Sequence, residues 1–187
     1  MKAESGFPRF WKSPRGMTMI ELMVTLAVAA TLVVLAIPSF ERTTRNALLA
    51  TSANDLSTSL SMARAQAIKA RRNVRICPTS NNTSCDAGAG WSNGWLMFVD
   101  RDANGVPATS ELVQVTDALD SKVTLTVPAA FSQWVQFRPT GGVIGNGGNS
   151  GNFILCSGDY HEFSRLVGVS ASGRVTTRKQ ANLCADS

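Results

Sequence analysis

One segment of the sequence carries oxygen side chains at the spacing of a calcium loop. Asp100, Asp102 and Asn104 lie two residues apart, and Glu111 closes a stretch of twelve residues. Carboxylate and amide oxygens at these intervals are typical of a Ca²⁺ loop between two helices. Here apolar runs that favour strands flank the segment, and Pro107 interrupts it. We therefore favour the alternative, a hairpin whose Asp and Asn side chains hydrogen-bond their own turn.

The remaining residue types that could catalyse a reaction form no recognisable site. His161 is the single histidine, and no cysteine pair near it completes a transition-metal site. No Gly-x-Ser-x-Gly nucleophile elbow accompanies His161, so a hydrolase triad is unsupported. The glycine-rich stretch at residues 141–151 matches neither a phosphate loop nor a dinucleotide fingerprint, and we expect it to be a flexible loop. The sequence predicts neither an enzyme nor a bound cofactor.

Basic residues gather near the C-terminus. Arg174, Thr176 and Arg178 would share one face of a strand, with Lys179 beside them and Arg165 upstream. Such an edge could neutralise a few phosphates of double-stranded DNA, giving weak, salt-sensitive binding without sequence preference. The alternative is a solvated edge strand whose charges prevent aggregation. Both interpretations stay open.

A single carboxylate interrupts the apolar run at residues 17–40. Residues 17–37 as a helix would be about 31 Å long, which matches a bilayer core. A carboxylate at that depth costs roughly 2.5–3.5 kcal/mol on insertion scales, so Glu21 is a functional candidate. A removable secretory signal and a plain membrane anchor are the alternatives. Neither accounts for an acidic residue one turn inside the run.

Charge is concentrated before this run. The net charge of +5 comes from 18 basic and 13 acidic side chains, and residues 1–16 alone contribute four basic and one acidic side chain. The rest of the chain is therefore nearly neutral, which excludes a strongly cationic body of the chromatin type. The basic block is expected to stay in the cytoplasm, with the bulk of the chain across the membrane. Disulfides persist on that side.

The periodicity of the sequence predicts an α+β fold. An apolar stripe at helical spacing follows Pro38, at Leu49, Ala53, Leu56, Leu60, Ala63 and Ala67. From residue 73 the period changes to two, and turn residues separate the runs. We expect a long N-terminal helix packed on antiparallel sheet, with strands at residues 74–77, 95–99, 111–116, 122–127, 134–138, 153–156, 166–170 and 174–178.

The segment from Gly16 to Glu21 (GMTMIE) closely resembles the type IV prepilin signature. The resemblance implies that a prepilin peptidase cuts after Gly16 and methylates the new N-terminus, Met17. It further implies that Glu21 attracts the amine of a neighbouring subunit during assembly, and that Pro38 kinks the helix. The chain then divides into a leader peptide (residues 1–16), a transmembrane and filament-core helix (17–40), an amphipathic helix (41–73) and a periplasmic β-rich head (74–187).

The body of the chain resembles the GspH/FimT class of minor pilins and pseudopilins. Three segments carry the resemblance: residues 90–100 (GWSNGWLMFVD), 137–142 (FRPTGG) and 172–175 (SGRV). It implies a pilin-like fold and a low-abundance subunit that primes and caps a type IV pilus or a type II secretion pseudopilus. Implied partners are other minor pilins, the major pilin or pseudopilin and the inner membrane. The implied location is the inner membrane with a periplasmic head, and then the filament tip at the cell surface.

Two further expectations follow from these families. FimT-like members bind DNA through a C-terminal Gly-Arg-x-Arg stretch; Gly173-Arg174 matches it, whereas Thr176 stands at the second arginine. The four cysteines allow three pairings. We favour Cys77–Cys85, which closes a short hydrophilic loop, with Cys156–Cys184, which resembles the C-terminal disulfide loop of type IV pilins. A loop of the latter length contributes roughly 3–4 kcal/mol in the chain-entropy model.

Overall fold

The computed structural model describes residues 16–158, 160–180 and 183–184, and for residues 35–39 and 160–163 it describes the backbone alone. The chain divides into two compact units, Met1–Glu41 and Arg42–Ser187. The expected leader peptide, apart from Gly16, and the side chain of His161 lie outside the described residues.

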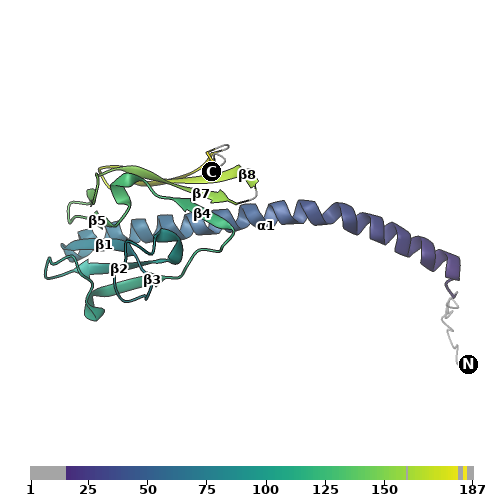
Figure 1. The fold of residues 1–187 in the computed structure, drawn as a ribbon, viewed down its shortest axis with the longest axis horizontal. Helices are drawn as coiled ribbons and strands as arrows, with labels where there is room; N and C mark the ends of the chain where they lie inside the picture. The colour runs from purple at the N-terminus through teal and green to yellow at the C-terminus, as the bar shows by residue number, and fades with distance from the viewer. Residues whose placement is uncertain (1–15, 159, 181–182, 185–187) are drawn as a thin grey trace, which may run out of the picture. The chain divides into compact units, whose positions relative to one another are not determined.

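The first unit contains the start of α1 (Met19–Ala70), the single long helix (Figure 1). The Thr18 hydroxyl caps it by accepting a hydrogen bond from the Glu21 amide at 3.3 Å. The helix continues past Pro38, so the two predicted helices form one element. The kink at Pro38 stays a prediction, because that side chain is not described. Among the described residues no helix is long and apolar enough to cross a membrane, and the span expected at residues 17–40 stays a prediction.

In the second unit α1 packs through the predicted apolar stripe. All six stripe residues, from Leu49 to Ala67, have no exposed surface, which confirms this prediction. The helix ends at Ala70, three residues before the predicted end. Arg71 adopts a left-handed conformation (φ 53°), a common way to terminate a helix.

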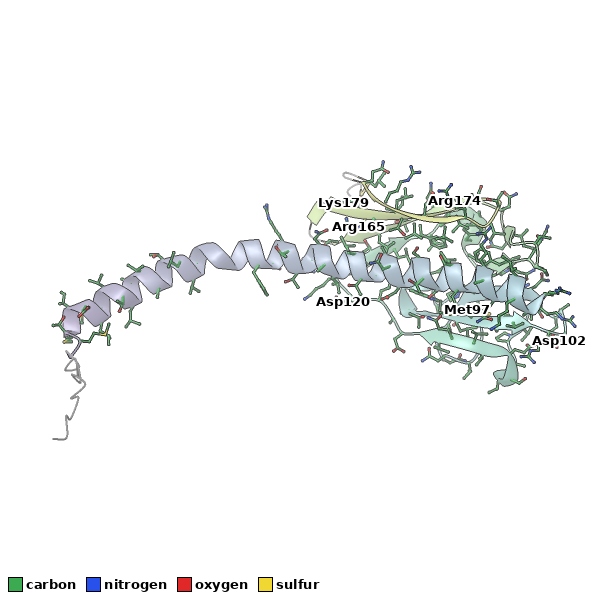
Figure 2. The ribbon with its side chains drawn as sticks, turned by 180° about the vertical axis from the view of Figure 1, so that it is seen from behind. Met97, Asp102, Asp120, Arg165, Arg174 and Lys179 are labelled. Atoms are coloured by element: carbon green, nitrogen blue, oxygen red, sulfur yellow. A yellow bond between two sulfur atoms is a disulfide. The ribbon has the colours of Figure 1, made fainter. Side chains whose placement is uncertain are left out.

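Two antiparallel sheets pack with this part of α1. The first has five strands in the order β3-β2-β1-β5-β6: β1 (Asn73–Pro78), β2 (Trp95–Asp100), β3 (Leu112–Thr116), β5 (Val135–Phe137) and β6 (Val143–Gly145). The second has the order β4-β7-β8-β9: β4 (Val123–Thr126), β7 (Gly151–Ser157), β8 (Tyr160–Val169) and β9 (Val175–Gln180). In both views strands of the two sheets lie on either side of α1 (Figures 1 and 2). The predicted α+β, pilin-like fold is confirmed.

Aromatic side chains fill the space between the sheets. The Trp91 ring lies 5.4 Å from Phe153 and 6.5 Å from Trp95, and Phe131 stacks on Phe153 at 5.8 Å. The buried Trp91 indole donates to the carbonyl oxygens of Phe131 and Ser132 at 3.1 and 3.2 Å. The Trp91 ring therefore adds apolar area to the core while its indole N–H keeps hydrogen-bond partners.

The glycine-rich stretch at residues 141–151 is ordered structure, and the prediction of a flexible loop there was wrong. It contains β6 and the first residue of β7. Val143 points into the core, and a Cβ on Gly145 would overlap the Ala130 carbonyl and the Phe131 ring. These glycines permit close packing of backbone on backbone. The expected strand at residues 111–116 also begins one residue later, because Glu111 ends a short 3₁₀ helix (Thr109–Glu111).

Candidate functional sites

The residues of the expected processing site lie together at the start of α1. Gly16 and Met17 are exposed and precede the first helical residue, so the peptide bond between them is accessible. Thr18 caps the helix, and Glu21 is the acidic residue of its first turn. A Thr followed by Glu at the third position is a helix-start pattern that also places negative charge at the positive end of the helix dipole.

Apolar side chains surround this part of α1. Residues 19–34 are all exposed in the first unit, and their large apolar members are Met19, Ile20, Leu22, Met23, Val24, Leu26, Val28, Leu32, Val33 and Val34. A helix that is apolar on every side is normally covered by protein or lipid. The unit therefore requires a partner surface.

The structure separates the predicted basic residues onto two faces of the second sheet. Arg165 lies opposite Lys179 in the β8–β9 register, on the same face as the buried Val167 and therefore facing the core. Arg165 donates to the Asn46 side chain of α1 at 2.7 Å. Arg178 lies on the outer face, and Figure 2 shows Arg174 and Lys179 toward opposite ends of β9. The expected four-residue cluster is thus reduced to Arg174 and Arg178.

These two arginines line a hollow of about 470 Å³ on the outer face. Its floor is Gly168, where a Cβ would lie 2.9 Å from the Asn152 amide oxygen and 3.1 Å from the Thr176 hydroxyl. The missing side chain leaves room beside these two polar groups in the hollow that the two arginines line. The site offers hydrogen-bond donors and positive charge, a combination that suits an anionic ligand.

Arg64 of α1 holds the turn that carries Arg174. Its guanidinium donates to the carbonyl oxygens of Gly141 and Ser172, both at 3.2 Å. Gly141 and Gly173 have φ values of 82° and 73° and pack so closely that a Cβ on Gly173 would overlap the Gly141 carbonyl. The sequence segments 137–142 and 172–175 therefore meet at one point, a contact that their spacing does not reveal.

The side chains of residues 100–111 stabilise the connection between β2 and β3. Both carboxylate oxygens of Glu111 accept backbone amides, from Arg101 at 2.8 Å and Ala108 at 3.3 Å. Asp102 accepts the Asn104 amide side chain at 2.6 Å. Among the described residues, no three His, Cys, Asp or Glu side chains could jointly hold a metal ion. The oxygens hydrogen-bond their own turns, as the hairpin interpretation predicted.

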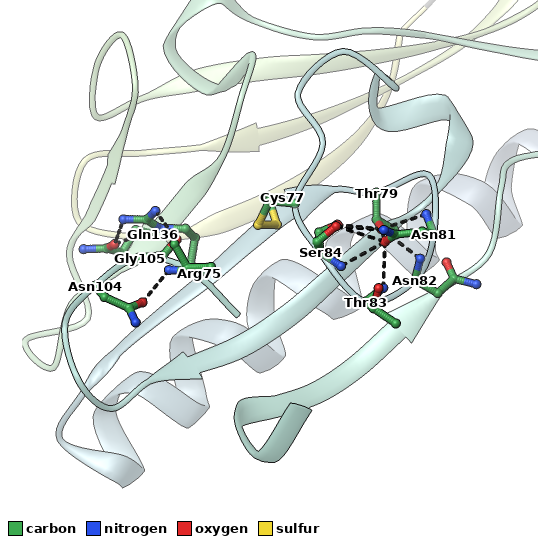
Figure 3. Close-up of a disulfide and its surroundings, with 12 residues drawn as sticks. Arg75, Cys77, Thr79, Asn81, Asn82, Thr83, Ser84, Asn104, Gly105 and Gln136 are labelled. Atoms are coloured by element: carbon green, nitrogen blue, oxygen red, sulfur yellow. Dashed lines mark hydrogen bonds between the residues drawn. A yellow bond between two sulfur atoms is a disulfide. The ribbon is translucent and has the colours of Figure 1, made fainter. Parts of the chain in front are cut away.

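Arg75 connects this hairpin to the first sheet (Figure 3). It donates to the Gly105 carbonyl at 2.8 Å and to the Gln136 side chain at 2.8 and 3.1 Å, and lies 4.4 Å from the Trp134 ring centre. Burial lowers the pKa of its guanidinium, while the nearby Asp100 carboxylate partly raises it. The group still carries its charge, and it balances Asp100, which is 4% exposed.

The structure contains the two disulfides favoured from the sequence, Cys77–Cys85 and Cys156–Cys184. Cys77 is fully buried with Leu96 and Phe98 in a second, smaller core on the outer face of the first sheet. The loop closed by Cys85 is held by the buried Thr79 hydroxyl, which donates to the Ser84 carbonyl at 2.8 Å (Figure 3). The loop that was expected only to be hydrophilic is therefore anchored in a small apolar core.

Family comparisons agree with this arrangement. The model of the family described as "Type II transport protein GspH" matches residues 52–173, which is most of the second unit. The chain belongs to the GspH family. The prokaryotic N-terminal methylation motif matches residues 11–37 of this GspH-family chain, over the exposed start of α1. The resemblance predicted from the sequence is confirmed.

Two solved structures can be compared with the GspH-family chain. The type IV minor pilin FimU of Pseudomonas aeruginosa is 20% identical, with a TM-score of 0.54 over 70% of this chain and 87% of that chain, which shows a shared fold. The minor pseudopilin EpsH of Vibrio cholerae is 12% identical, with a TM-score of 0.44 over 71% of this chain and 96% of that chain. No protein among the curated sequences matches.

Proposed function

We propose that this GspH-family chain is a minor pilin or pseudopilin that primes assembly of a type IV pilus or a type II secretion pseudopilus and lies at the filament tip. The observation that carries the proposal is the start of α1, where the methylation motif coincides with an apolar surface exposed on every side. Such a surface is stable only when other subunits or lipid cover it. Assembly into a helical filament core supplies that cover.

Glu21 carries the assembly step. Cleavage after Gly16 creates a positive amine at Met17, only four residues before the Glu21 carboxylate. Burying either charge alone in an apolar filament core is strongly unfavourable, whereas a pair of opposite charges offsets much of this cost. The amine of one subunit therefore seeks the Glu21 carboxylate of its neighbour, which sets the stagger of the two helices.

The test replaces Glu21→Ala and measures how much chain enters sheared filaments. We expect cleavage by the prepilin peptidase to continue, because Gly16 and Met17 are unchanged, while incorporation falls at least tenfold. Asp102→Ala removes an equal charge from an exposed position of the head and should leave incorporation unchanged. Normal incorporation of the Glu21→Ala chain would contradict the proposed role.

We further propose that the chain is anchored in the inner membrane before assembly, with residues 1–16 in the cytoplasm and the head in the periplasm. The methylation motif and the positive charge of residues 1–16 support this orientation. Processing requires the prepilin peptidase as a partner, and assembly requires other minor pilins and the major subunit. Gold labelling of the head should mark filament ends; even labelling along the shaft would contradict the tip position.

A second function, capture of double-stranded DNA, is favoured by one observation. Arg174 and Arg178 line the same outer hollow together with the Asn152 and Thr176 polar groups. Two cations and the hydroxyl and amide donors around one hollow suit phosphate contacts. Arg165 and Lys179 face the other side and are not part of this proposal.

The DNA test uses the full chain in detergent, with both disulfides formed, titrated with duplex DNA across salt concentrations. We expect affinity to fall steeply with salt and to be lost on Arg174→Gln with Arg178→Gln. The control, Arg101→Gln with Lys122→Gln, removes the same charge from other exposed positions. Equal losses in both variants would indicate attraction to overall charge, and no binding at low salt would leave the assembly function alone.

A further inference from the structure

A second hollow, of about 290 Å³, lies between α1 and β3. Asp55 and Thr58 of α1 form one wall, and residues 114–117 form the other. β3 is the last strand of its sheet, with β2 as its one neighbour among the described strands. One side of β3 therefore presents main-chain groups to this hollow without a strand to pair them.

The side chains that line the α1–β3 hollow are acidic or polar, apart from Val115. Asp55 and Asp117 supply carboxylates, and no basic side chain is among the described residues that line it. The Gln114 amide nitrogen donates to Ser59 and Thr116, whereas its oxygen is buried and has no partner in the described part of the chain. The hollow therefore suits a cationic side chain that can donate hydrogen bonds.

The outer side of β3 is apolar. Val113 and Val115 are each 40% exposed. The β2–β3 register shifts between Met97 and Phe98, so that Val113 lies at a bulge. A bulge restricts strand addition, which leaves residues 114–116 as the part of β3 free to pair.

We infer that the β3 edge receives an extended, basic segment of another pilin-type subunit by strand addition. Main-chain hydrogen bonds pair the segment with residues 114–116. An Arg or Lys of the segment reaches Asp55 and Asp117, and its alternate apolar side chains cover Val115. The inference rests on the proposed assembly function, for which it names the contact between heads.

The test places a photo-cross-linking amino acid at Val115 in the full chain, in cells that produce the other subunits carrying the N-terminal methylation motif. We expect an adduct with one of those subunits, mapped by mass spectrometry to a segment containing Arg or Lys. Asp55→Asn with Asp117→Asn should lower the adduct yield about two- to fivefold, the range for an exposed ion pair. Asp102→Asn with Asp120→Asn changes charge equally elsewhere and should leave the yield unchanged.

Three results would overturn the inference. They are no adduct from Val115, an adduct with a second copy of this chain, and equal adduct yields in the Asp55/Asp117 variant and the Asp102/Asp120 control. Two formed disulfides verify that each variant is folded. Filament incorporation of the same variants separates this inference from the assembly function. If the chain enters filaments but gives no adduct from Val115, the β3 contact alone is refuted. If the Glu21→Ala chain enters filaments normally, the proposed assembly function is refuted.

Discussion

Asp86 illustrates how single side chains organise the loops of the head. The Ser80 hydroxyl donates to its carboxylate at 2.7 Å, and the amides of Gly88 and Ala89 add 3.0 and 3.3 Å contacts. The Ser80 bond, with these amides, lowers the pKa of Asp86 below its ordinary value of 3.8. The stabilisation is therefore complete above the ordinary pKa and is lost as pH falls through the lowered one.

A carboxyl NMR titration should place the midpoint of Asp86 below 3.8. Ser80→Ala should raise that midpoint toward the ordinary value, because the largest stabilising bond to the charged form is removed. Thr83→Ala changes another hydroxyl of the same loop that does not contact Asp86 and should leave the midpoint unchanged. A midpoint that Ser80→Ala does not move would contradict the assignment.

Residue types predicted some of these roles and concealed others. The disulfide pairing was predicted with the help of a resemblance to type IV pilins, and the structure contains it. A lone charge in an apolar run marked Glu21, whose role stays a prediction. Arg64 and Arg75 were not recognisable, because their partners are carbonyl and amide oxygens 30 to 108 residues away. A contact with backbone atoms far away in the chain produces no recognisable pattern of residue types or spacing in the sequence.

At the scale of elements, the helix stripe is the clearest test of packing. Leu56→Ala removes a fully buried side chain from α1 and should lower the free energy of unfolding by about 2–5 kcal/mol. Asn54→Ala on the exposed side should change it by less than about 0.5 kcal/mol. Urea unfolding of the full chain in detergent measures both, and equal losses would show that the stripe does not carry the core.

The two turns held by Arg64 should tolerate no side chain at Gly173. Gly173→Ala combines a left-handed φ of 73° with an overlap on the Gly141 carbonyl, so we expect a loss of more than about 1 kcal/mol. Gly158→Ala is the matched control, since no atom lies within 4 Å of the added Cβ. A thermal melt distinguishes them, and two equal melting temperatures would refute the argument.

The first disulfide should matter more than its short loop suggests. Cys77→Ser with Cys85→Ser places a hydroxyl in the small core beside Leu96 and Phe98, in addition to releasing the loop. We expect the free energy of unfolding to fall by about 2–4 kcal/mol. The same unfolding measurement applies, and a loss below about 1 kcal/mol would show that the loop does not depend on this bond.

Strand periodicity predicted most of both sheets but not β6. Apolar or alternating runs marked the other strands, including the short β4 and β5. β6 has three residues between glycines, and its place is fixed by contacts with Ala130 and Phe131 that come from elsewhere in the chain. The same limit applies to the basic residues of β8 and β9, because their two faces follow from a register that one sequence does not define.

For the whole molecule, the order of strands along the chain differs from their division between the two sheets. β4 precedes β5 and β6 in the sequence but pairs with β7, in the other sheet. The second sheet therefore cannot form until residues 151–180 are available, whereas β1 and β2 can pair early. Resolving this order from the sequence would require knowing which strands are neighbours, which periodicity does not report.

Cys156–Cys184 bridges 28 residues and encloses the last two strands of the chain. In the proposed export to the periplasm the head would emerge with its C-terminus last, so this bond would close only after Cys184 has crossed. A subunit whose synthesis stopped after β9 but before Cys184 would present an unpaired thiol at Cys156. On that proposal, an oxidising compartment would leave a reactive thiol on a truncated subunit that a finished subunit lacks.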